Sequence, residues 1–279
     1  MNASCTFSDM DSTIPLTENG SLRQLIVVIG NTSTSMVLFG VASHPVTERI
    51  PTARLADAAS MNSLLDMLLN HHGPFDEAAI CSVVPEVARR CTAGLASVLD
   101  LPVMVVGASL RLPFRLDYEN GNSFGADRIA LCAWSQQLFP GEAHIAIDIG
   151  TATTFDVMNA QCEYLGGLIM PGIDMMAGAL HASTAQLPLV RIDRSCTLLG
   201  RSTAECIKNG IFWGVVMQIR GLIGEIKHYL KSKHGAQKIG VLVTGGNSEL
   251  VARELGFPVI VDELAVARGS RLLLDLNRA

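Results

Sequence analysis

The segment VVIGNTSTSMVL at residues 27–38 is matched 120 residues later by IDIGTATTFDVM at residues 147–158. Both segments open with apolar residues, reach an Ile-Gly pair, continue through small residues and threonine, and become apolar again. A short apolar run on each side of a glycine turn is typical of a β-hairpin. Two such hairpins in one chain predict two similar domains, each of which starts its sheet with this unit.

Strand and helix patterns alternate outward from each hairpin. After the first hairpin, the spacing of apolar residues predicts helices over 58–69 and 86–99. Apolar runs predict further strands of this half over 78–84 and 102–106. In the second half the predicted elements are a helix over 129–139, a strand over 164–170, alternating helices up to residue 230, strands over 239–243 and 259–261, and a final helix over 265–277. The second strands of the two hairpins are predicted over 36–41 and 155–159. This alternation is typical of the α/β fold class.

The 279 residues divide into an extension and two domains. Residues 1–22 are polar and lack a sustained periodicity, so we expect them to form a flexible N-terminal extension. The two hairpins then predict an N-terminal domain over 23–120 and a C-terminal domain over 121–279.

Composition argues against several classes of protein. Residues of the AVILMFWYC group make up 49% of the chain and charged residues 17%, so the chain can bury a large core. A net charge of −5 and only 5% aromatic residues argue against a nucleic-acid-binding surface. Seven cysteines without a C-x-x-C pair argue against a disulfide framework. Without an uninterrupted apolar run of about 18 residues, we expect a cytoplasmic protein that binds neither membrane nor nucleic acid.

The hairpin turns carry residue types that bind phosphate. Backbone N–H groups at a glycine turn, together with threonine and serine hydroxyls, form a cradle for phosphate oxygens. Glycine is needed there because a side chain would keep the ligand away from the backbone. A third turn of this kind, TGGN at residues 244–247, follows a predicted strand. Because the chain has neither a Walker A nor a GxGxxG motif, we expect the two hairpins to face each other and hold a triphosphate.

The segment FGADR at residues 124–128 stands at the predicted start of a helix. An aspartate in this position often caps the helix, and Asp127 has that structural interpretation. It also has a functional one, in which its carboxylate accepts a proton from an attacking hydroxyl and Arg128 stabilises anionic charge. The residues of this segment leave both interpretations open.

Eight short motifs extend the pattern from about residue 25 to the end of the chain. They are IGNT (29–32), SVVP (82–85), GADRI (125–129), DIGTATTFDV (148–157), EYLGGLIMPGI (163–173), RST (201–203), NGIFWG (209–214) and TGG (244–246). In these motifs the chain resembles the type III pantothenate kinases. The resemblance implies an actin-like ATPase fold, in which two ribonuclease-H-like domains enclose a nucleotide cleft. It also implies a homodimer that uses ATP to phosphorylate pantothenate to 4'-phosphopantothenate, the first step of coenzyme A biosynthesis.

The same resemblance implies roles for individual residues. Asp127 matches the proton acceptor of the family, and Asp148 matches the ligand of a monovalent cation, K⁺ or NH₄⁺. Pantothenate contacts are implied for Tyr118, Gly125, Ala126, Asp127, Arg128 and Thr203. ATP contacts are implied for Thr151 and for the first loop, which consists of Val28, Ile29, Gly30, Asn31, Thr32, Ser33, Thr34 and Ser35.

The first loop departs from the family pattern at one residue. The family has an aspartate that helps to hold the Mg²⁺ of Mg–ATP, whereas this chain has Val28. Valine offers no oxygen ligand, and Mg²⁺ requires oxygen. We expect the loss of this carboxylate to cost about 2–4 kcal/mol of transition-state stabilisation. Three functions stay open: an active pantothenate kinase, a binding or regulatory protein of the same fold, and a kinase or phosphatase for another small molecule.

Overall fold

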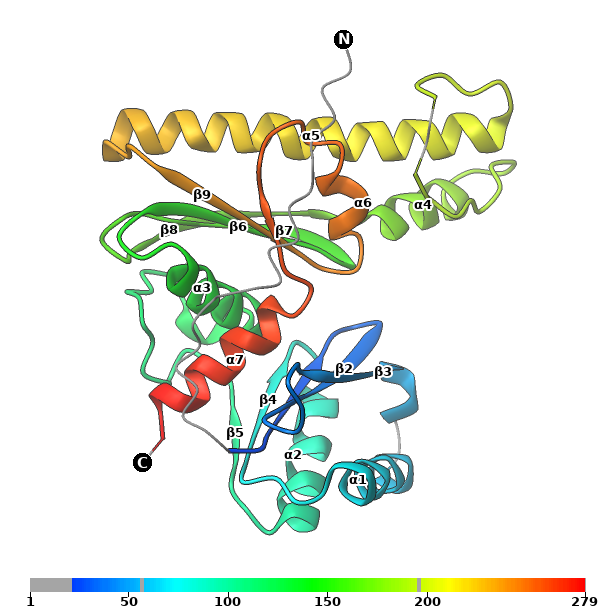
Figure 1. The fold of residues 1–279 in the computed structure, drawn as a ribbon. Helices are drawn as coiled ribbons and strands as arrows, with labels where there is room; N and C mark the ends of the chain where they lie inside the picture. The colour runs from blue at the N-terminus through cyan, green and yellow to red at the C-terminus, as the bar shows by residue number, and fades with distance from the viewer. Residues whose placement is uncertain (1–21, 56–57, 195–196, 279) are drawn as a thin grey trace.

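Two five-stranded sheets, each flanked by helices, make up the molecule (Figure 1). The computed structural model describes residues 22–55, 58–194 and 197–278, so the predicted N-terminal extension lies outside it except for its last residue. The helices in this part of the chain are η1 (Thr52–Leu55), α1 (Ala58–His72), α2 (Pro85–Leu99), η2 (Gly121–Ser123), α3 (Ala126–Leu138), α4 (Ile173–Ala182), α5 (Thr203–His234), α6 (Ser248–Ala252) and α7 (Ala265–Leu276). Figure 1 shows the layers from top to bottom as α5, the second sheet, α3 with α7, the first sheet, and α1 with α2.

The first sheet is built around the first predicted hairpin. Strand β1 (Gln24–Ile29) pairs antiparallel with β2 (Ser33–Phe39) and parallel with β4 (Glu77–Ser82). Strand β3 (Val46–Pro51) extends the sheet beside β2, and β5 (Val103–Val105) extends it beside β4. The resulting strand order is β3-β2-β1-β4-β5.

The second sheet repeats this plan. Strand β6 (Ala143–Ile149) pairs antiparallel with β7 (Ala152–Met158) and parallel with β9 (Ile239–Thr244). Strands β8 (Tyr164–Pro171) and β10 (Ile260–Val261) lie at the two edges. Its order, β8-β7-β6-β9-β10, is that of the first sheet, with the same parallel and antiparallel pairs. The two similar sheets predicted from the sequence repeat are therefore confirmed.

The two hairpins differ by one residue in their turns. Ile29 pairs with Thr34 across residues 30–33, whereas Ile149 pairs with Thr153 across residues 150–152. The repeat offset is therefore 120 residues before the turn and 119 after it. Val28 and Asp148 still occupy equivalent positions, because both precede the turn.

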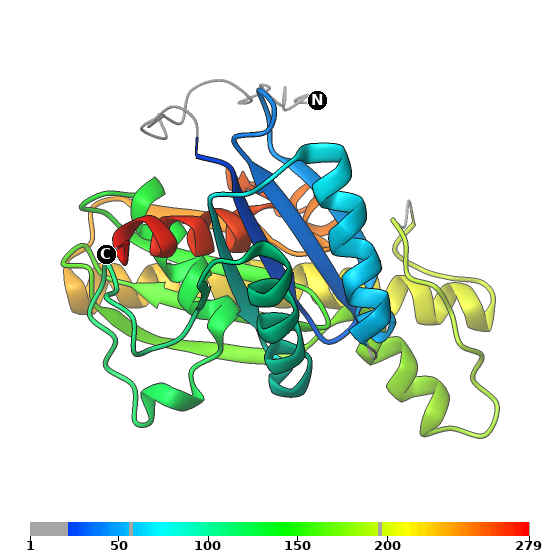
Figure 2. The ribbon, with the colours of Figure 1, turned by 90° about the horizontal axis from the view of Figure 1, so that it is seen from below.

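The helices cover opposite faces of each sheet. In the second sheet, Ile147 packs in a cluster with Phe212 of α5, whereas the neighbouring Ala146 packs with Leu131 and Trp134 of α3. Helix α5 therefore lies on one face and α3 on the other. In the first sheet, α1 and α2 cover the outer face, which is turned to the viewer in Figure 2.

Helices α3 and α7 lie side by side between the two sheets (Figure 1). They are in close contact at Gly269, where an added Cβ would collide with the backbone carbonyl of Ala130. Helix α7 also packs on the first sheet, because Leu274 shares a cluster with Ile26 and Phe39. The C-terminal helix thus connects the two halves of the molecule.

Several elements differ from the sequence-based expectation. Strand β3 is absent from that expectation because its sequence, VTERIP, carries charges and lies at an exposed edge. Strands β2 and β7 begin three residues earlier than expected, directly after their turns. Instead of several alternating helices up to residue 230, the chain forms α4 and then the single 32-residue helix α5. In the described part of the chain, no helix combines the length and apolar character needed to cross a membrane.

Candidate active site

The turns of the two hairpins meet between the sheets. The hydroxyl oxygens of Thr32 and Thr151 are 3.1 Å apart, which places the β1–β2 turn against the β6–β7 turn. Both turns follow strands whose parallel neighbours end at the same edge, β4 beside β1 and β9 beside β6. In open α/β sheets this edge, at the carboxyl ends of the parallel strands, is where ligands bind. The contact between the turns supports the expected facing arrangement.

Only part of the predicted ATP-contacting loop is exposed at the first turn. Asn31, Thr32 and Ser33 are exposed, and the turn is closed by the Gly30 N–H, which donates to the Ser33 carbonyl at 3.0 Å. Thr34 is fully buried, and its hydroxyl lies 3.0 Å from that of Thr52. Thr34 therefore stabilises the base of the loop, and the exposed residues form its tip.

The third glycine turn packs against the second hairpin. The Asn247 N–H donates to the Ile149 carbonyl at 3.0 Å, which joins the end of β9 to the end of β6. Gly245 has a φ of +96°, a conformation that favours glycine. An added Cβ there would also collide with Oδ1 of Asp148. The TGG motif thus forms part of the wall around the Asp148 carboxylate.

Asp127 lies in the first turn of α3, where its Oδ1 accepts a 2.8 Å hydrogen bond from the Arg128 N–H. Gly125 precedes the helix, and an added Cβ would lie 2.5 Å from the same oxygen. Burial raises the pKa of Asp127, against the smaller effects of the Arg128 hydrogen bond and charge. The negative charges of Asp127 and Asp148 both raise the pKa of buried Cys81 at the end of β4. Ala126 and Ile129 of α3 also pack in one cluster with Cys81, so Asp127 lies near the end of β4.

Arg128 is buried in a network that includes two residues the sequence prediction missed. Its Nη2 donates to Oδ1 of Asp156 at 2.7 Å, and its Nε donates to the same oxygen at 3.0 Å. Nη2 also donates to the Tyr164 hydroxyl at 2.7 Å. Burial opposes the charge of Arg128, yet Asp156 raises its pKa by hydrogen bonding and by charge. An aspartate inside an apolar strand requires such a partner, and this signal is present in the segment TTFDV.

Tyr118 and Phe124 form the aromatic surroundings of this network. The rings of Tyr118, Phe124 and Tyr164 pack edge to face, with centroids 4.9 to 6.2 Å apart. The guanidinium carbon of Arg128 lies 4.4 Å from the centroid of Phe124. Tyr118 remains 40% exposed, so the predicted substrate-contacting tyrosine faces solvent beside Arg128.

The residues around Asp148 fit a monovalent cation. Among the described residues, the Asp148 carboxylate has neither a hydrogen-bond nor an ion-pair partner, and burial with the charges of Asp127 and Asp156 raises its pKa to about 7. Thr154 pairs with Asp148 across β6 and β7, and its buried hydroxyl also lacks a partner. A half-buried carboxylate and a hydroxyl without partners are oxygen ligands of the kind that hard cations take.

The residues present do not form a magnesium site of their own. Val28 packs against an apolar cluster that includes Val106 and contributes no oxygen. Among the side chains that the structure describes, no three His, Cys, Asp or Glu residues are grouped to hold a metal ion. We therefore treat Mg²⁺ as part of the substrate Mg–ATP.

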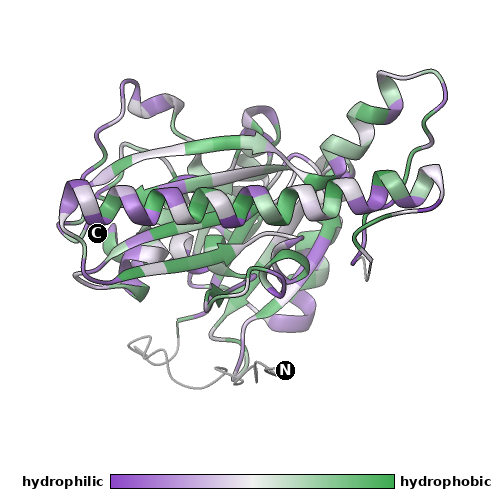
Figure 3. Ribbon diagram, turned by 90° about the horizontal axis from the view of Figure 1, so that it is seen from above, coloured by the Kyte–Doolittle hydropathy of each residue, from purple (hydrophilic) through white to green (hydrophobic). Residues whose placement is uncertain are grey.

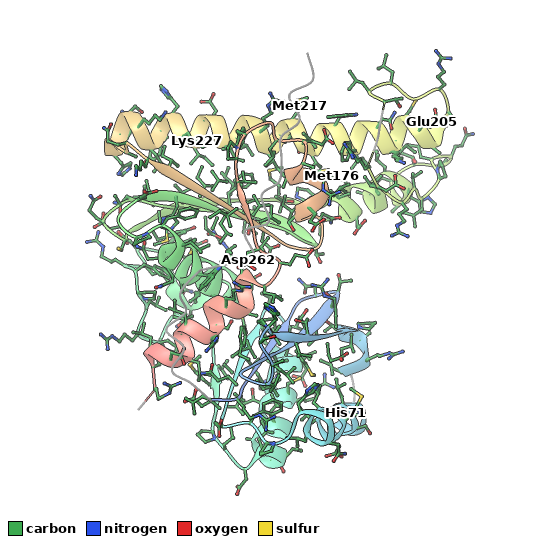
Figure 4. All side chains as sticks on the ribbon, viewed as in Figure 1. His71, Met176, Glu205, Met217, Lys227 and Asp262 are labelled. Atoms are coloured by element: carbon green, nitrogen blue, oxygen red, sulfur yellow. The ribbon has the colours of Figure 1, made fainter. Side chains whose placement is uncertain are left out.

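Thr203 is not brought together with Asp127 within one chain. It begins α5, on the opposite face of the second sheet from α3, and Glu205 marks this distant end of the helix in Figure 4. Thr203 instead lines an apolar groove of about 870 Å³ between α4 and α5. Exposed Met175 and Leu180 also line this groove. Figure 3 shows apolar positions along both helices.

The two paired sheets, with glycine turns at corresponding strand ends, define the actin-like ATPase fold. A putative 2-dehydro-3-deoxygalactonokinase from Sinorhizobium meliloti has this fold, with a TM-score of 0.55 at 13% identity over 91% of this chain and 98% of that one. Within this class, the chain belongs to the type III pantothenate kinase family, whose sequence model matches residues 24–225. The predicted fold class and family are confirmed.

Curated relatives of this family match most of the chain. The type III pantothenate kinase of Chlorobaculum tepidum is 52% identical over 254 residues, which cover 91% of this chain and 94% of the relative. That of Chlorobaculum parvum is 53% identical over the same length, with 91% and 95% covered. A structure described as a putative Baf family transcriptional activator from Campylobacter jejuni aligns with a TM-score of 0.56 at 18% identity, over 91% of this chain and 98% of that one. At that identity the likeness shows the fold alone.

Proposed function

We propose that the chain phosphorylates pantothenate with Mg–ATP, and that Asp127 is the general base. The contact of 3.1 Å between Thr32 and Thr151 carries this proposal, because it brings two phosphate-binding turns together near the Asp127 carboxylate. Family membership supports the substrate and favours an active kinase over a binding protein.

The reaction transfers one phosphoryl group from ATP. Asp127 accepts the proton of the primary hydroxyl of pantothenate, whose oxygen forms a bond to the γ-phosphorus. The bond from the γ-phosphorus to the bridging oxygen breaks, and ADP leaves with the electron pair. Backbone N–H groups and hydroxyls at residues 31–33 and 151–152 stabilise the charge on the phosphoryl oxygens. The raised pKa of Asp127 suits a base, because it makes the carboxylate a better proton acceptor.

A monovalent cation, K⁺ or NH₄⁺, is held in this proposal by Asp148 and Thr154. It supplies positive charge beside the phosphates when bound. The unpartnered carboxylate and hydroxyl support this site. We also assign a cytoplasmic location, because ATP is the phosphate donor and Cys81, Cys91, Cys132, Cys162 and Cys206 are free thiols.

The functional unit in this proposal is a homodimer. Thr203 matches a pantothenate contact of the family, yet it lies across the second sheet from Asp127. A second copy of the chain can supply Thr203 to the first copy's site. The groove between α4 and α5 offers an apolar surface for that contact and is lined by Met176 of α4. Met176 also lines a neighbouring hollow together with Met217 of α5 (Figure 4).

Asp127→Asn tests the general base. The amide cannot accept the proton, so kcat should fall by about 10²- to 10⁴-fold. The measurement is ADP release in a coupled assay with ATP, pantothenate, MgCl₂ and KCl. Asp174→Asn is the matched control, because Asp174 occupies the same position in the first turn of α4 and is exposed.

The two parts of the proposal fail separately. A wild-type protein that forms no phosphopantothenate at high enzyme concentration would reject the kinase. An Asp127→Asn variant that keeps wild-type turnover would reject only the assignment of the base.

A further inference from the structure

The ion pair of Arg128 has no role in the proposed reaction as described above. Arg128 directly follows Asp127, yet it forms its ion pair with Asp156 on β7, 28 residues further along the chain. Within the described residues, Asp156 is the one carboxylate in ion-pair range of Arg128. The Asp127 side chain instead accepts a hydrogen bond from the backbone N–H of Arg128.

The geometry around the ion pair holds the guanidinium in one orientation. Nε and Nη2 both donate to Asp156, whose side chain is fully buried, and Nη2 donates in addition to the Tyr164 hydroxyl. The ring of Phe124 packs against the guanidinium. These contacts come from β7, β8 and the segment before α3, so the guanidinium is held from several sides.

Gly167 on β8 provides the space for this network. An added Cβ would lie 2.6 Å from Nη2 of Arg128 and 2.8 Å from the Tyr164 hydroxyl. Gly167 pairs with Asp156 across β7 and β8. The glycine therefore leaves the opening through which the arginine reaches its carboxylate.

A free Arg128 would have a competing partner within reach. Its own neighbour, Asp127, is a half-buried carboxylate, and both side chains flank Gly125, where an added Cβ would lie 2.5 Å from Oδ1 of Asp127 and 3.7 Å from Cδ of Arg128. A guanidinium released there would pair with this carboxylate through charge-assisted hydrogen bonds. Such a pair would occupy the oxygens that the substrate proton needs. The pairing with Asp156 removes this competition.

We propose that Asp156 is a positioning residue that holds the guanidinium of Arg128 away from Asp127, so that the Asp127 carboxylate stays open to the substrate hydroxyl. The same pairing fixes Arg128 beside Tyr118, which is 40% exposed. Tyr164 holds the guanidinium as a second hydrogen-bond partner, and Gly167 leaves the space that the guanidinium occupies. The inference rests on the proposed function, because it assumes that Asp127 is the base.

The test uses three full-length variants, Asp156→Asn, Arg128→Gln and the two combined. In Asp156→Asn, the released Arg128 pairs with Asp127, so kcat should fall by about tenfold or more while KM for ATP stays unchanged. The combined variant has no guanidinium to block Asp127. Its kcat should therefore exceed that of Asp156→Asn, although its KM for pantothenate should be raised as in Arg128→Gln.

A purely structural ion pair predicts the opposite pattern. The second substitution would then lower kcat further or leave it unchanged, and either result would overturn the inference. An unchanged kcat in Asp156→Asn would overturn it as well. Glu249→Gln is the matched control, because it removes a carboxylate that pairs with Arg253 at 2.7 Å on the exposed surface of α6, and it should keep wild-type kcat.

A second variant covers the case in which Asp156→Asn does not fold, since loss of one partner of a buried ion pair is destabilising. Tyr164→Phe removes the other anchor of Arg128 and keeps the ring. It should lower kcat in the same direction by a smaller factor, and an unchanged kcat would reject the anchoring role. If Asp127→Asn itself turns over normally, the proposed base fails, and this outcome is distinct from a failure of Asp156.

Discussion

Asp148 is a residue whose burial has a measurable cost in stability. Its pKa is raised from an ordinary 3.8 to about 7, so the folded chain holds a proton that the unfolded chain releases between these values. The stability that comes from this proton is complete below pH 3.8 and is lost as the pH rises through 7. Without a bound cation, the folded protein therefore carries an unfavourable charge above neutral pH.

Asp148→Asn should remove this cost. We expect its Tm to exceed that of the wild type by about 2–4 °C or more at pH 8, and the gain should shrink toward pH 5. Thermal unfolding at several pH values without ATP or K⁺ measures the difference. A gain of equal size at every pH would contradict the explanation, and Asp174→Asn serves as the exposed control.

Val28 occupies the position in the first half that Asp148 occupies in the second half, so the first half lacks a carboxylate there. Val28→Asp places an oxygen ligand at the position equivalent to Asp148, so KM for ATP should fall or kcat should rise by a few-fold to about 10²-fold. Coupled assays at varied MgCl₂ measure both constants. Val28→Asn has nearly the same size without the charge, and an equal gain in that variant would exclude the anionic ligand as the cause.

At the scale of elements, the crossing of α3 and α7 is the contact most sensitive to volume. Gly269→Ala puts a methyl group into the carbonyl of Ala130, and a backbone carbonyl cannot rotate away as a side chain can. We expect a loss of about 1–3 kcal/mol in the free energy of unfolding. Because α3 carries Asp127 in its first turn, kcat should fall as well.

Urea unfolding and the coupled assay measure the two effects of Gly269→Ala. Gly224→Ala is the matched control, because this glycine lies on α5 with open space around its Cβ position. Alanine there should stabilise the helix by up to about 1 kcal/mol. Equal behaviour of the two variants would show that the helix crossing tolerates the methyl group.

The sequence predicted the elements with a strong apolar pattern and missed those without one. The hairpin repeat predicted both sheets, since β1 and β6 are buried strands that end at a glycine. Strand β3 has an exposed, charged sequence, and only its pairing with β2 makes it a strand. The place of Thr203 across the sheet from Asp127 depends on tertiary packing, which no local pattern encodes.

The Arg128 network shows the same limit in the site. The segment GADR indicates the base and the arginine, but the partner of the arginine lies on another strand. Asp156 would have been recognisable as a buried aspartate between Phe155 and Val157. That its partner is the guanidinium of Arg128 follows only once α3 is packed on the second sheet.

At the scale of the whole molecule, the α4–α5 groove decides the oligomeric state that we propose. Leu180→Glu introduces a charge into the apolar groove, where Leu180 is 37% exposed, and should convert a dimer into a monomer. Size-exclusion chromatography with light scattering measures the mass. Met67→Glu is the control, because Met67 is similarly exposed on α1 at 41%.

If Thr203 reaches the site of a second copy, the Leu180→Glu monomer should also lose affinity for pantothenate. A monomer with unchanged KM for pantothenate would separate dimer formation from substrate binding. A wild-type chain that is already monomeric would reject the dimer.

The hydrogen bond between the Thr32 and Thr151 hydroxyls links the tips of the two turns directly. A polyphosphate that enters between the two tips breaks this hydrogen bond. Its oxygens then accept hydrogen bonds from the same two hydroxyls. The net cost in binding free energy is on the order of one exchanged hydrogen bond, about 1 kcal/mol. Nucleotide binding therefore separates the two turn tips and replaces the hydrogen bond between them with hydrogen bonds to phosphate.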